Sequence, residues 1–474
     1  MNHFDDDAEL AALVEPYRTK VVERIRLLSR AERERSLREA HYSIVHLPAS
    51  DIYIDLVTDS GTSAMSDQQW AGLMTGDESY MGSRNYLRFQ DTVRKLTGYP
   101  QVIPTHQGRA AENIVMELLV KPGDFVASNT LFDTTRAHVH NAGARPIDLV
   151  GDCLWDFQTE QPFKGNLDLA RLAAALAKHH QSMPFLVVTV VNNMAGSSPV
   201  SMANIRETRR LADRYGIPLL FDACRFAENA YFIQQREEGY RDKSIREICL
   251  EMFSYGHGCW MSAKKDGLVN IGGFIALQDE ALANRCRERL VLYEGFPTYG
   301  GLARRDLEAM AIGLEEGVTE DHLRQRISQV AYLGELIERQ AGVVISRPTG
   351  GSGVFLDVSS VYGHLPAERL PWVAFTADLY LTGGVRAAAA PFNLVRIDPA
   401  TGELSERTFQ VARLAVPRRV YGKSHMDFVG LAMNRVKQRA HLTQGYRLVH
   451  QPEVLGHFFA KFEPWCSRET AVPE

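Results

Sequence analysis

Short apolar runs that alternate with helical patterns fill the middle of the chain and constrain its fold more than any other feature. From about residue 90, β-rich apolar runs stand at 124–129, 144–151, 185–193, 217–224 and 271–278. Helical patterns lie between them, such as the one at 205–216, which ends on a glycine as a C-terminal cap would. Strands that alternate with helices in this way are typical of βαβ units. We therefore expect an α/β fold with a mainly parallel, buried sheet and helices on both faces.

Different patterns flank this region. Residues 18 to 40 carry apolar positions at helical spacing among many charges, which predicts an amphipathic surface helix. After about residue 320, a long helical pattern precedes short strands and Gly/Pro-rich connections, which predicts a second, α+β domain. A chain of 474 residues agrees with two domains, because one hydrophobic core stops growing at about 250 to 300 residues. We expect an N-terminal segment over 1–60 that packs with the small domain, a large domain over 61–320 and a small domain over 321–474.

Composition narrows the possible partners and compartment. A formal net charge of -5 provides no basic field for nucleic acid, and no apolar run approaches the ~20 residues that span a bilayer. The six cysteines are scattered without a C-x-x-C pair, which argues against a disulfide framework and a zinc site. The acidic N-terminus lacks the pattern of a signal peptide. We therefore expect a cytoplasmic protein with reduced thiols and a small-molecule partner, and with neither a nucleic-acid nor a membrane partner.

Two groups of polar residues stand at or near predicted strand ends. A turn that contains Gly108 opens onto a helical pattern, and free N–H groups at a helix start, together with Gln107 and Arg109, suit a phosphate. The run at 217–224 reaches Asp222 near its end, with Arg225 just beyond it. A carboxylate in that place either caps a helix or holds a proton on a heterocyclic nitrogen.

A third group lies in the segment MSAKKDGLVN (261–270), where Lys264 and Lys265 are adjacent. A lysine forms a Schiff base with an aldehyde when its amine is partly desolvated or crowded by another cation, although such a pair is more often a solvated surface feature. Ser262 offers a hydroxyl to a phosphate oxygen. Phosphate, ring nitrogen and aldehyde are the three groups by which pyridoxal 5'-phosphate is held, so the three groups of residues together predict that cofactor.

Long segments of the chain resemble the β-eliminating lyases, the family of tryptophanase and tyrosine phenol-lyase. They are LVTDSGTSAMSDQQWAGLMTGDESYMGSRNY (56–86), IPTHQGRAAEN (103–113), PVSMANIRETR (199–209), FDACRFAENAYFI (221–233), MSAKKDGLVNIGGF (261–274), YEGFPTYGGL (293–302) and ARLAVPRRVY (412–421). The resemblance runs from about residue 40 to 465. It implies the type I fold of pyridoxal-phosphate enzymes, which is aspartate aminotransferase-like, with a large cofactor-binding domain. It also implies a homotetramer with active sites at a dimer interface, and activation by a monovalent cation such as K+.

The resemblance implies a role for each residue of the matching motifs. Lys265 would bind the cofactor aldehyde with Lys264 as its supporting neighbour, and Asp222 would pair with the ring nitrogen. The other implied contacts are Gln107, Gly108, Arg109 and Ser262 with the phosphate, Phe132 with the ring face, and Asn193 and Arg225 with the phenolic oxygen.

Substrate and cation contacts are implied in the same way. Arg413, helped by Thr58 and Ser60, would hold the substrate α-carboxylate by a two-point contact. Tyr80 would protonate the leaving carbon after Lys265 has taken the Cα proton. The implied products are pyruvate, ammonium and the free aromatic compound. The implied cation ligands are Glu78 and the backbone oxygens of Gly61 and Asn270.

The residues implied for the substrate side-chain pocket are Asp133, Phe296, Ala388, Ala390, His457 and Phe458. Asp133 and His457 match tryptophanase, and Ala390 stands where tyrosine phenol-lyase carries an arginine that helps to hold the phenol hydroxyl. Both differences favour an indole leaving group over phenol. Ala388 and Ala390 also replace bulkier aliphatic residues of tryptophanase, which leaves room for a larger side chain.

L-Tryptophan is therefore the first substrate that we expect. The alternatives are a carbon–sulfur β-lyase that acts on cysteine S-conjugates, and a tyrosine phenol-lyase-like enzyme that acts on a substituted aromatic amino acid. A transaminase is disfavoured because lyase-specific segments match. A non-catalytic scaffold that binds the cofactor is disfavoured because Lys265, Asp222, Arg413 and Tyr80 are all present.

Overall fold

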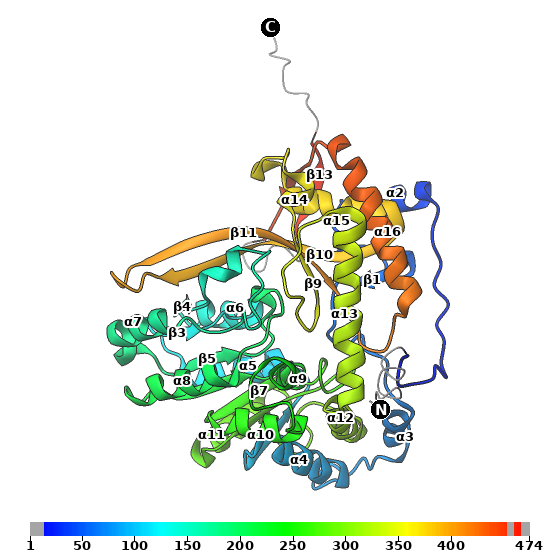
Figure 1. The fold of residues 1–474 in the computed structure, drawn as a ribbon. Helices are drawn as coiled ribbons and strands as arrows, with labels where there is room; N and C mark the ends of the chain where they lie inside the picture. The colour runs from blue at the N-terminus through cyan, green and yellow to red at the C-terminus, as the bar shows by residue number, and fades with distance from the viewer. Residues whose placement is uncertain (1–13, 453–458, 466–474) are drawn as a thin grey trace, which may run out of the picture.

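One sheet of eleven strands runs through the protein (Figure 1). The computed structural model describes residues 14–452 and 459–465. The strand order across the sheet is β2 (Gln101–Thr105), β8 (Gly273–Leu277), β7 (Gly258–Ser262), β6 (Leu219–Asp222), β5 (Leu186–Thr189), β3 (Phe125–Ser128), β4 (Arg145–Asp148), β10 (Val385–Ile397), β11 (Leu404–Ala415) and β9 (Gly353–Asp357), with β1 (Ile54–Leu56) beside β10. A separate pair consists of β12 (Tyr446–His450) and β13 (Lys461–Pro464).

The middle of the sheet is parallel, as the sequence predicts. Neighbouring strands from β4 through β3, β5 and β6 to β7 are parallel, and β8 and β2 continue the edge antiparallel. The five apolar runs form β3, β4, β5, β6 and β8, which confirms those predictions. The pattern did not predict β7 or β2. Strand β2 contains Pro104 and pairs only with β8 at the edge, where a proline is tolerated.

Helices cover both faces of the sheet because successive side chains of a strand point to opposite sides. Leu186 and Val188 of β5 join one core, whereas Phe185 and Val187 join the other. The first core includes side chains from α4 (Arg84–Thr97), α7 (Leu169–His179), α8 (Met202–Asp213), α9 (Phe226–Arg236), α10 (Ile245–Ser254) and α12 (Arg304–Gly317), beside which lies α3 (Asp67–Thr75). The second includes side chains from α5 (Gly108–Leu119), α6 (Asp133–Asn141) and α11 (Glu280–Tyr293).

A further core lies at the other end of the molecule. It is formed by strands β1 and β9–β13, by α13 (Glu320–Ala341), and by α2 (Arg30–Glu39), α14 (Ser359–Tyr362), α15 (Pro371–Gly383) and α16 (Lys423–Arg439). Helix α13 confirms the long helix expected after residue 320. Its first turns pack against the first core of the large sheet, and its later turns pack in this further core (Figure 1). The boundaries proposed near residues 60 and 320 stay predictions.

Two sequence-based expectations are wrong. Residues 18–29 are not helical; α2 begins only at Arg30, where the Ser29 hydroxyl accepts the Glu32 N–H and the Glu32 carboxylate accepts the Ser29 N–H. Val21 and Val22 are more than four-fifths exposed, so these two apolar side chains are not buried against the protein as a helix with a packed face would require. Strands β10 and β11 are 13 and 12 residues long rather than short, because they pair with each other as one hairpin.

No helix in residues 14–452 or 459–465 combines the length and apolar character needed to cross a membrane.

Candidate active site

The carboxyl ends of the central parallel strands surround a cavity. Strand β6 ends at Asp222, and its neighbour β7 ends at Ser262, three residues before Lys265. Ligand sites of parallel sheets lie beyond such strand ends. The cavity is lined by Ser60, Gln107, Gly108, Arg109, Glu112, Phe132, Thr134, Thr189, Val190, Asn192, Asn193, Asp222, Cys224, Arg225, Ser262, Lys264 and Lys265. All the residues expected to contact the cofactor are in this lining.

One end of the cavity is cationic and closely packed. Helix α5 begins at Gly108, and a Cβ added there would lie 2.6 Å from the Cβ of Ser262, so only glycine allows this close approach. The Lys264 amine lies 3.5 Å from Oε1 of Gln107. Burial lowers the pKa of Lys264, and the charges of Lys265 and Arg109 lower it further. A helix N-terminus with three nearby cations favours a bound anion such as phosphate.

The cavity lining also contains two buried carboxylates. Asp222 is 4% exposed, and its Oδ1 accepts the Cys224 N–H at 3.2 Å. Glu112 is 3% exposed and accepts the Thr134 hydroxyl at 2.7 Å. Burial and the charge of Asp222 raise the pKa of Glu112 to about 7. Glu112 was not among the residues predicted from the sequence, although it lies four residues after Gly108 and therefore on the same face of α5.

A prediction for the cofactor-free protein follows from Glu112. The pKa of Glu112 is about 7 in the folded chain and 4.5 ordinarily. Between pH 4.5 and 7, the folded state therefore keeps a proton on Glu112 that the unfolded state has released. Stability therefore falls as pH rises from about 4.5 to 7. We expect Glu112→Gln, which mimics the protonated acid, to raise the free energy of unfolding at pH 8 by on the order of 2 kcal/mol, and by much less at pH 5. Denaturant unfolding at both values tests this, and equal effects would contradict it.

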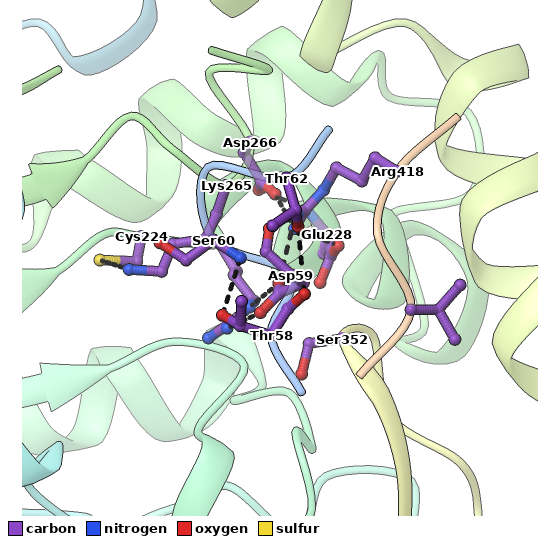
Figure 2. Close-up of polar contacts among 12 residues, drawn as sticks. Thr58, Asp59, Ser60, Thr62, Cys224, Glu228, Lys265, Asp266, Ser352 and Arg418 are labelled. Carbon is purple, nitrogen blue, oxygen red and sulfur yellow. Dashed lines mark hydrogen bonds and ion pairs between the residues drawn. The ribbon is translucent and has the colours of Figure 1, made fainter. Parts of the chain in front are cut away.

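Lys265 also lines the cavity. Its amine is 3.6 Å from the Cys224 sulfur and 5.9 Å from the centre of the Phe132 ring (Figure 2 shows Lys265 and Cys224). Burial and the charge of Asp222 raise the pKa of Cys224 to about 12, so this residue stays a neutral thiol. Cys224 was not among the residues predicted from the sequence, although it lies between two predicted site residues in the motif DACR.

Asn193 and Arg225 border the same cavity from different elements. Oδ1 of Asn193 accepts the hydroxyls of Ser197 and Ser352 at 3.1 and 3.2 Å. Among the described residues its amide nitrogen has no hydrogen-bond partner, which suits an oxygen acceptor in the cavity. Arg225 is held by a two-point bond from Nε and Nη2 to Asp59, at 2.9 and 2.7 Å.

A larger cavity of about 420 Å³ adjoins the first and shares Lys265, Phe132 and Arg225 with it. The two hairpin strands contribute Arg413 and Ala388, which are opposite each other in the register of β10 and β11. The rest of the lining includes Thr58, Ser60, Asp133, Ala389, Ala390, Phe392 and Val411, with Tyr42–Val45, Trp372, Val373, Thr376 and Phe462 from the other end of the molecule.

Arg413 is a partly buried cation whose charge is incompletely paired. Its Nη2 donates to the Val57 carbonyl at 2.9 Å, and its Nε is buried without a hydrogen-bond partner among the described residues. Burial lowers the pKa of Arg413, which the charge of Asp59 partly offsets. An unsatisfied guanidinium beside a cavity fits a carboxylate ligand, because an uncompensated buried charge is costly.

Some predicted site residues lie elsewhere. Tyr80 is 54% exposed, and its ring packs beside Phe296 and Tyr299, with centroids 5.8 and 5.3 Å away. Neither Tyr80 nor Phe296 lines the two cavities. Glu78 accepts the Arg304 N–H at 3.3 Å.

The other residues expected at the cation lie together. The side-chain amide of Asn270 donates to the Gly61 carbonyl at 3.0 Å. Within residues 14–452 and 459–465, no group of three His, Cys, Asp or Glu side chains is arranged to hold a metal ion. His457 and Phe458 are outside the described residues.

Comparisons with known proteins agree with this architecture. The Beta-eliminating lyase family matches residues 55–432. The chain is 50% identical over 452 residues to a tryptophanase of Salinibacter ruber, with 95% of this chain and 96% of that protein covered. It is 47% identical over 451 residues to a tyrosine phenol-lyase of Symbiobacterium thermophilum, with 95% and 98% covered.

Solved structures agree on the fold. A serine palmitoyltransferase of Sphingomonas wittichii superposes with a TM-score of 0.55 at 12% identity, over 82% of this chain and 88% of that chain. Another structure, described as SPT with PLP, gives a TM-score of 0.53 at 13% identity, over 81% and 88%. These findings confirm the fold class and the resemblance noted in the sequence. The chain therefore belongs to the β-eliminating lyases and is a lyase that depends on pyridoxal phosphate.

Proposed function

We propose that the enzyme cleaves aromatic L-amino acids, with L-tryptophan first among them, into pyruvate, ammonium and the free aromatic compound. The observation that carries the proposal is Arg413, whose buried Nε has no hydrogen-bond partner among the described residues and which lines a cavity of about 420 Å³ together with Lys265. An amino acid whose carboxylate meets Arg413 would have its side chain in the part of that cavity lined by Ala388–Ala390.

The residues of the first cavity fit pyridoxal phosphate. The start of α5 at Gly108, with its nearby cations, suits the phosphate, and buried Asp222 suits the ring nitrogen. Lys265 supplies the amine for the aldehyde, and the Asn193 amide suits the phenolic oxygen. When bound, the cofactor supplies an aldehyde that joins an amine and a ring that withdraws electrons from the substrate Cα.

In the proposed reaction, each side chain acts on a particular atom of the substrate or of the cofactor ring. Arg413, with Thr58 and Ser60, binds the α-carboxylate and orients the Cα–H bond. Lys265 takes the proton from Cα, while Asp222 holds the proton on the ring nitrogen. Tyr80 delivers a proton to the side-chain carbon that leaves, so that the Cβ–Cγ bond breaks. Water is the final reactant, and it completes the release of pyruvate and ammonium.

Asp133 and Ala390 support indole rather than phenol as the leaving group. Both line the larger cavity, and Asp133 is near enough to Arg413 for their charges to interact. An indole N–H can donate to the Asp133 carboxylate, whereas Ala390 offers no partner to a phenol hydroxyl. A site without that hydrogen bond discriminates poorly in favour of a hydroxylated ring.

Substrate choice is tested with purified holoenzyme, K+ and a panel of L-amino acids. We expect pyruvate and indole in equal amounts from L-tryptophan, and at least about tenfold lower kcat/KM for L-tyrosine. Pyruvate only from S-alkylcysteines, with tryptophan and tyrosine both inert, would contradict the tryptophan proposal. That outcome would support the second candidate, a carbon–sulfur β-lyase.

We also propose a homotetramer in which each active site combines two copies of the chain. Tyr80 supports this proposal, because it is absent from the lining of the larger cavity of its own chain and its ring is about half exposed. The same arrangement would bring Glu78 of one copy to Gly61 and Asn270 of another and form a K+ site there. A cytoplasmic location is proposed from the unpaired cysteines of the described chain.

A further inference from the structure

Six charged side chains form a buried ion cluster beside the candidate active site, and two of them, Asp59 and Arg225, also line the larger cavity. Its members are Asp59, Arg225, Glu228, Asp266, Arg326 and Arg418, each at most 5% exposed. They come from the loop after β1, the start of α9, the turn after β7, helix α13 and the segment after β11. Figure 2 shows Asp59, Glu228, Asp266 and Arg418 converging beside Lys265.

Arg418 contacts three carboxylates of this cluster and one backbone group. Nη1 donates to the Asp59 carboxylate at 3.1 Å and to the Asp59 backbone carbonyl at 3.3 Å. Nη2 donates to Glu228 at 2.6 Å and to Asp266 at 2.9 Å. Burial opposes the charge on Asp59, but Arg225 and Arg418 outweigh it and hold the Asp59 pKa well below its usual range.

These contacts fix a short loop at several points. Arg413 holds the Val57 carbonyl at 2.9 Å, and the Gly61 N–H donates to the Lys264 carbonyl at 2.7 Å. Arg418 holds the middle of the loop through the backbone of Asp59. Thr58 and Ser60 are the two neighbours of Asp59, so any movement of Asp59 displaces both.

Arg418 also connects this loop to the lysine turn. Asp266 is the residue after Lys265, and its other carboxylate oxygen accepts the N–H groups of Ala227 and Glu228 at 2.8 and 3.1 Å. One guanidinium therefore joins the loop of Thr58 and Ser60, the start of α9 after Arg225, and the turn that carries Lys265.

Arg326 provides an internal comparison. It is as deeply buried as Arg418, and its Nε donates to Glu228 at 2.9 Å. Its two other nitrogens donate to the backbone carbonyls of Val416 and Ser352, at 2.5 and 3.2 Å. Its nearest approach to the Asp59 carboxylate is 3.9 Å, beyond hydrogen-bond distance. Arg326 thus stabilises the same cluster without holding the loop backbone.

We propose that Arg418 is a positioning residue that sets the geometry of the substrate α-carboxylate site through Asp59. The proposal rests on the carboxylate role assigned above to Arg413, Thr58 and Ser60. Arg418 does not touch the substrate; it fixes the backbone between the two hydroxyl side chains that do. Its loss therefore reduces recognition of the carboxylate specifically, in addition to any loss of stability.

The test compares two ligands that differ only at the carboxyl group. L-Alanine and L-alaninamide have no leaving group on Cβ, so their binding to the holoenzyme is measured at equilibrium from the cofactor absorbance. We expect the wild-type enzyme to prefer L-alanine. In Arg418→Met the Kd for L-alanine should rise about tenfold or more, as expected for lost hydrogen bonds between charged groups, while the Kd for L-alaninamide changes less than about threefold.

Arg326→Met is the matched control. We expect it to lower the thermal midpoint by a similar amount, yet to keep the alanine-to-alaninamide preference of the wild type. If Arg418→Met does not fold, Arg418→Lys keeps the buried charge, but an amine cannot maintain the guanidinium's contacts with all three carboxylates and the Asp59 carbonyl. We expect the same loss of carboxylate preference in that variant.

Two results would overturn the proposal for Arg418. One is an equal weakening of both ligands in Arg418→Met, and the other is the same loss of preference in Arg326→Met. A wild-type enzyme that binds both ligands equally would instead contradict the carboxylate role of Arg413, and with it the basis of this proposal. The wild-type measurement alone shows that outcome, so a failure of the carboxylate role is distinguished from a failure of the proposal for Arg418.

Discussion

Replacement of Lys265 by alanine is expected to lower pyruvate release from L-tryptophan by at least about 10³-fold, because the same amine holds the cofactor and moves the Cα proton. Both lysines line the cavity, and the Lys265 amine is the one near Cys224 and the Phe132 ring. Borohydride reduction of the wild-type holoenzyme should fix the cofactor on Lys265. Peptide mass mapping should find this modification in the wild type and not in Lys265→Ala.

Lys264→Ala is the matched control for this prediction. The Lys264 amine lies 3.5 Å from Gln107, at the cationic end of the cavity, rather than beside Cys224. We expect the variant to bind the cofactor about tenfold more weakly, because one phosphate-facing charge is lost, and still to be modified at Lys265. Modification at Lys264 in the wild type, or near-normal turnover by Lys265→Ala, would show that the assignment of the two lysines is wrong.

The parts of the fold that could be predicted are those in which sequence pattern and burial agree. The runs that became β3, β5 and β6 are continuous apolar segments, because strands in the middle of a parallel sheet are buried on both faces. The segment at 18–29 has helical periodicity, yet its apolar residues Val21 and Val22 stay exposed, and periodicity alone does not reveal whether a face is buried. Helical stability comes mostly from such packing.

The same reasoning explains which site residues were found. Asp222 is the last residue of β6 and Lys265 lies three residues after β7, so their neighbourhood could be inferred from local sequence. The contacts of Arg418 with Asp59 and Glu228 span 359 and 190 residues of sequence, and no local pattern predicts them. Glu112 looks like an ordinary polar position of a helix until the fold brings it beside Asp222.

Tyr80→Phe should lower kcat for carbon–carbon cleavage of L-tryptophan by about 10²- to 10⁴-fold, because the variant lacks the acid that protonates the leaving carbon. Elimination from S-alkylcysteines needs no such proton, since a thiolate leaves without it. We therefore expect the variant to keep S-alkylcysteine turnover within about threefold of the wild type, if Tyr80 is a general acid. Equal losses on the two substrate classes would contradict that role.

Mixing two inactive variants tests which copy of the chain supplies Tyr80. If a site combines Lys265 of one copy with Tyr80 of another, a dimer of Lys265→Ala with Tyr80→Phe contains one doubly altered site and one intact site. Random reassembly of equal amounts after mild dissociation makes half of the dimers mixed, and one of the two sites in each mixed dimer is intact. Tryptophan cleavage should therefore return to about a quarter of the wild-type rate. The exposed ring of Tyr80 and its absence from the cavity lining both favour this result. Failure to recover activity, with mixed oligomers demonstrated by mass spectrometry, would mean that Tyr80 and Lys265 of the same chain act together and that the loop of Tyr80 moves into its own cavity.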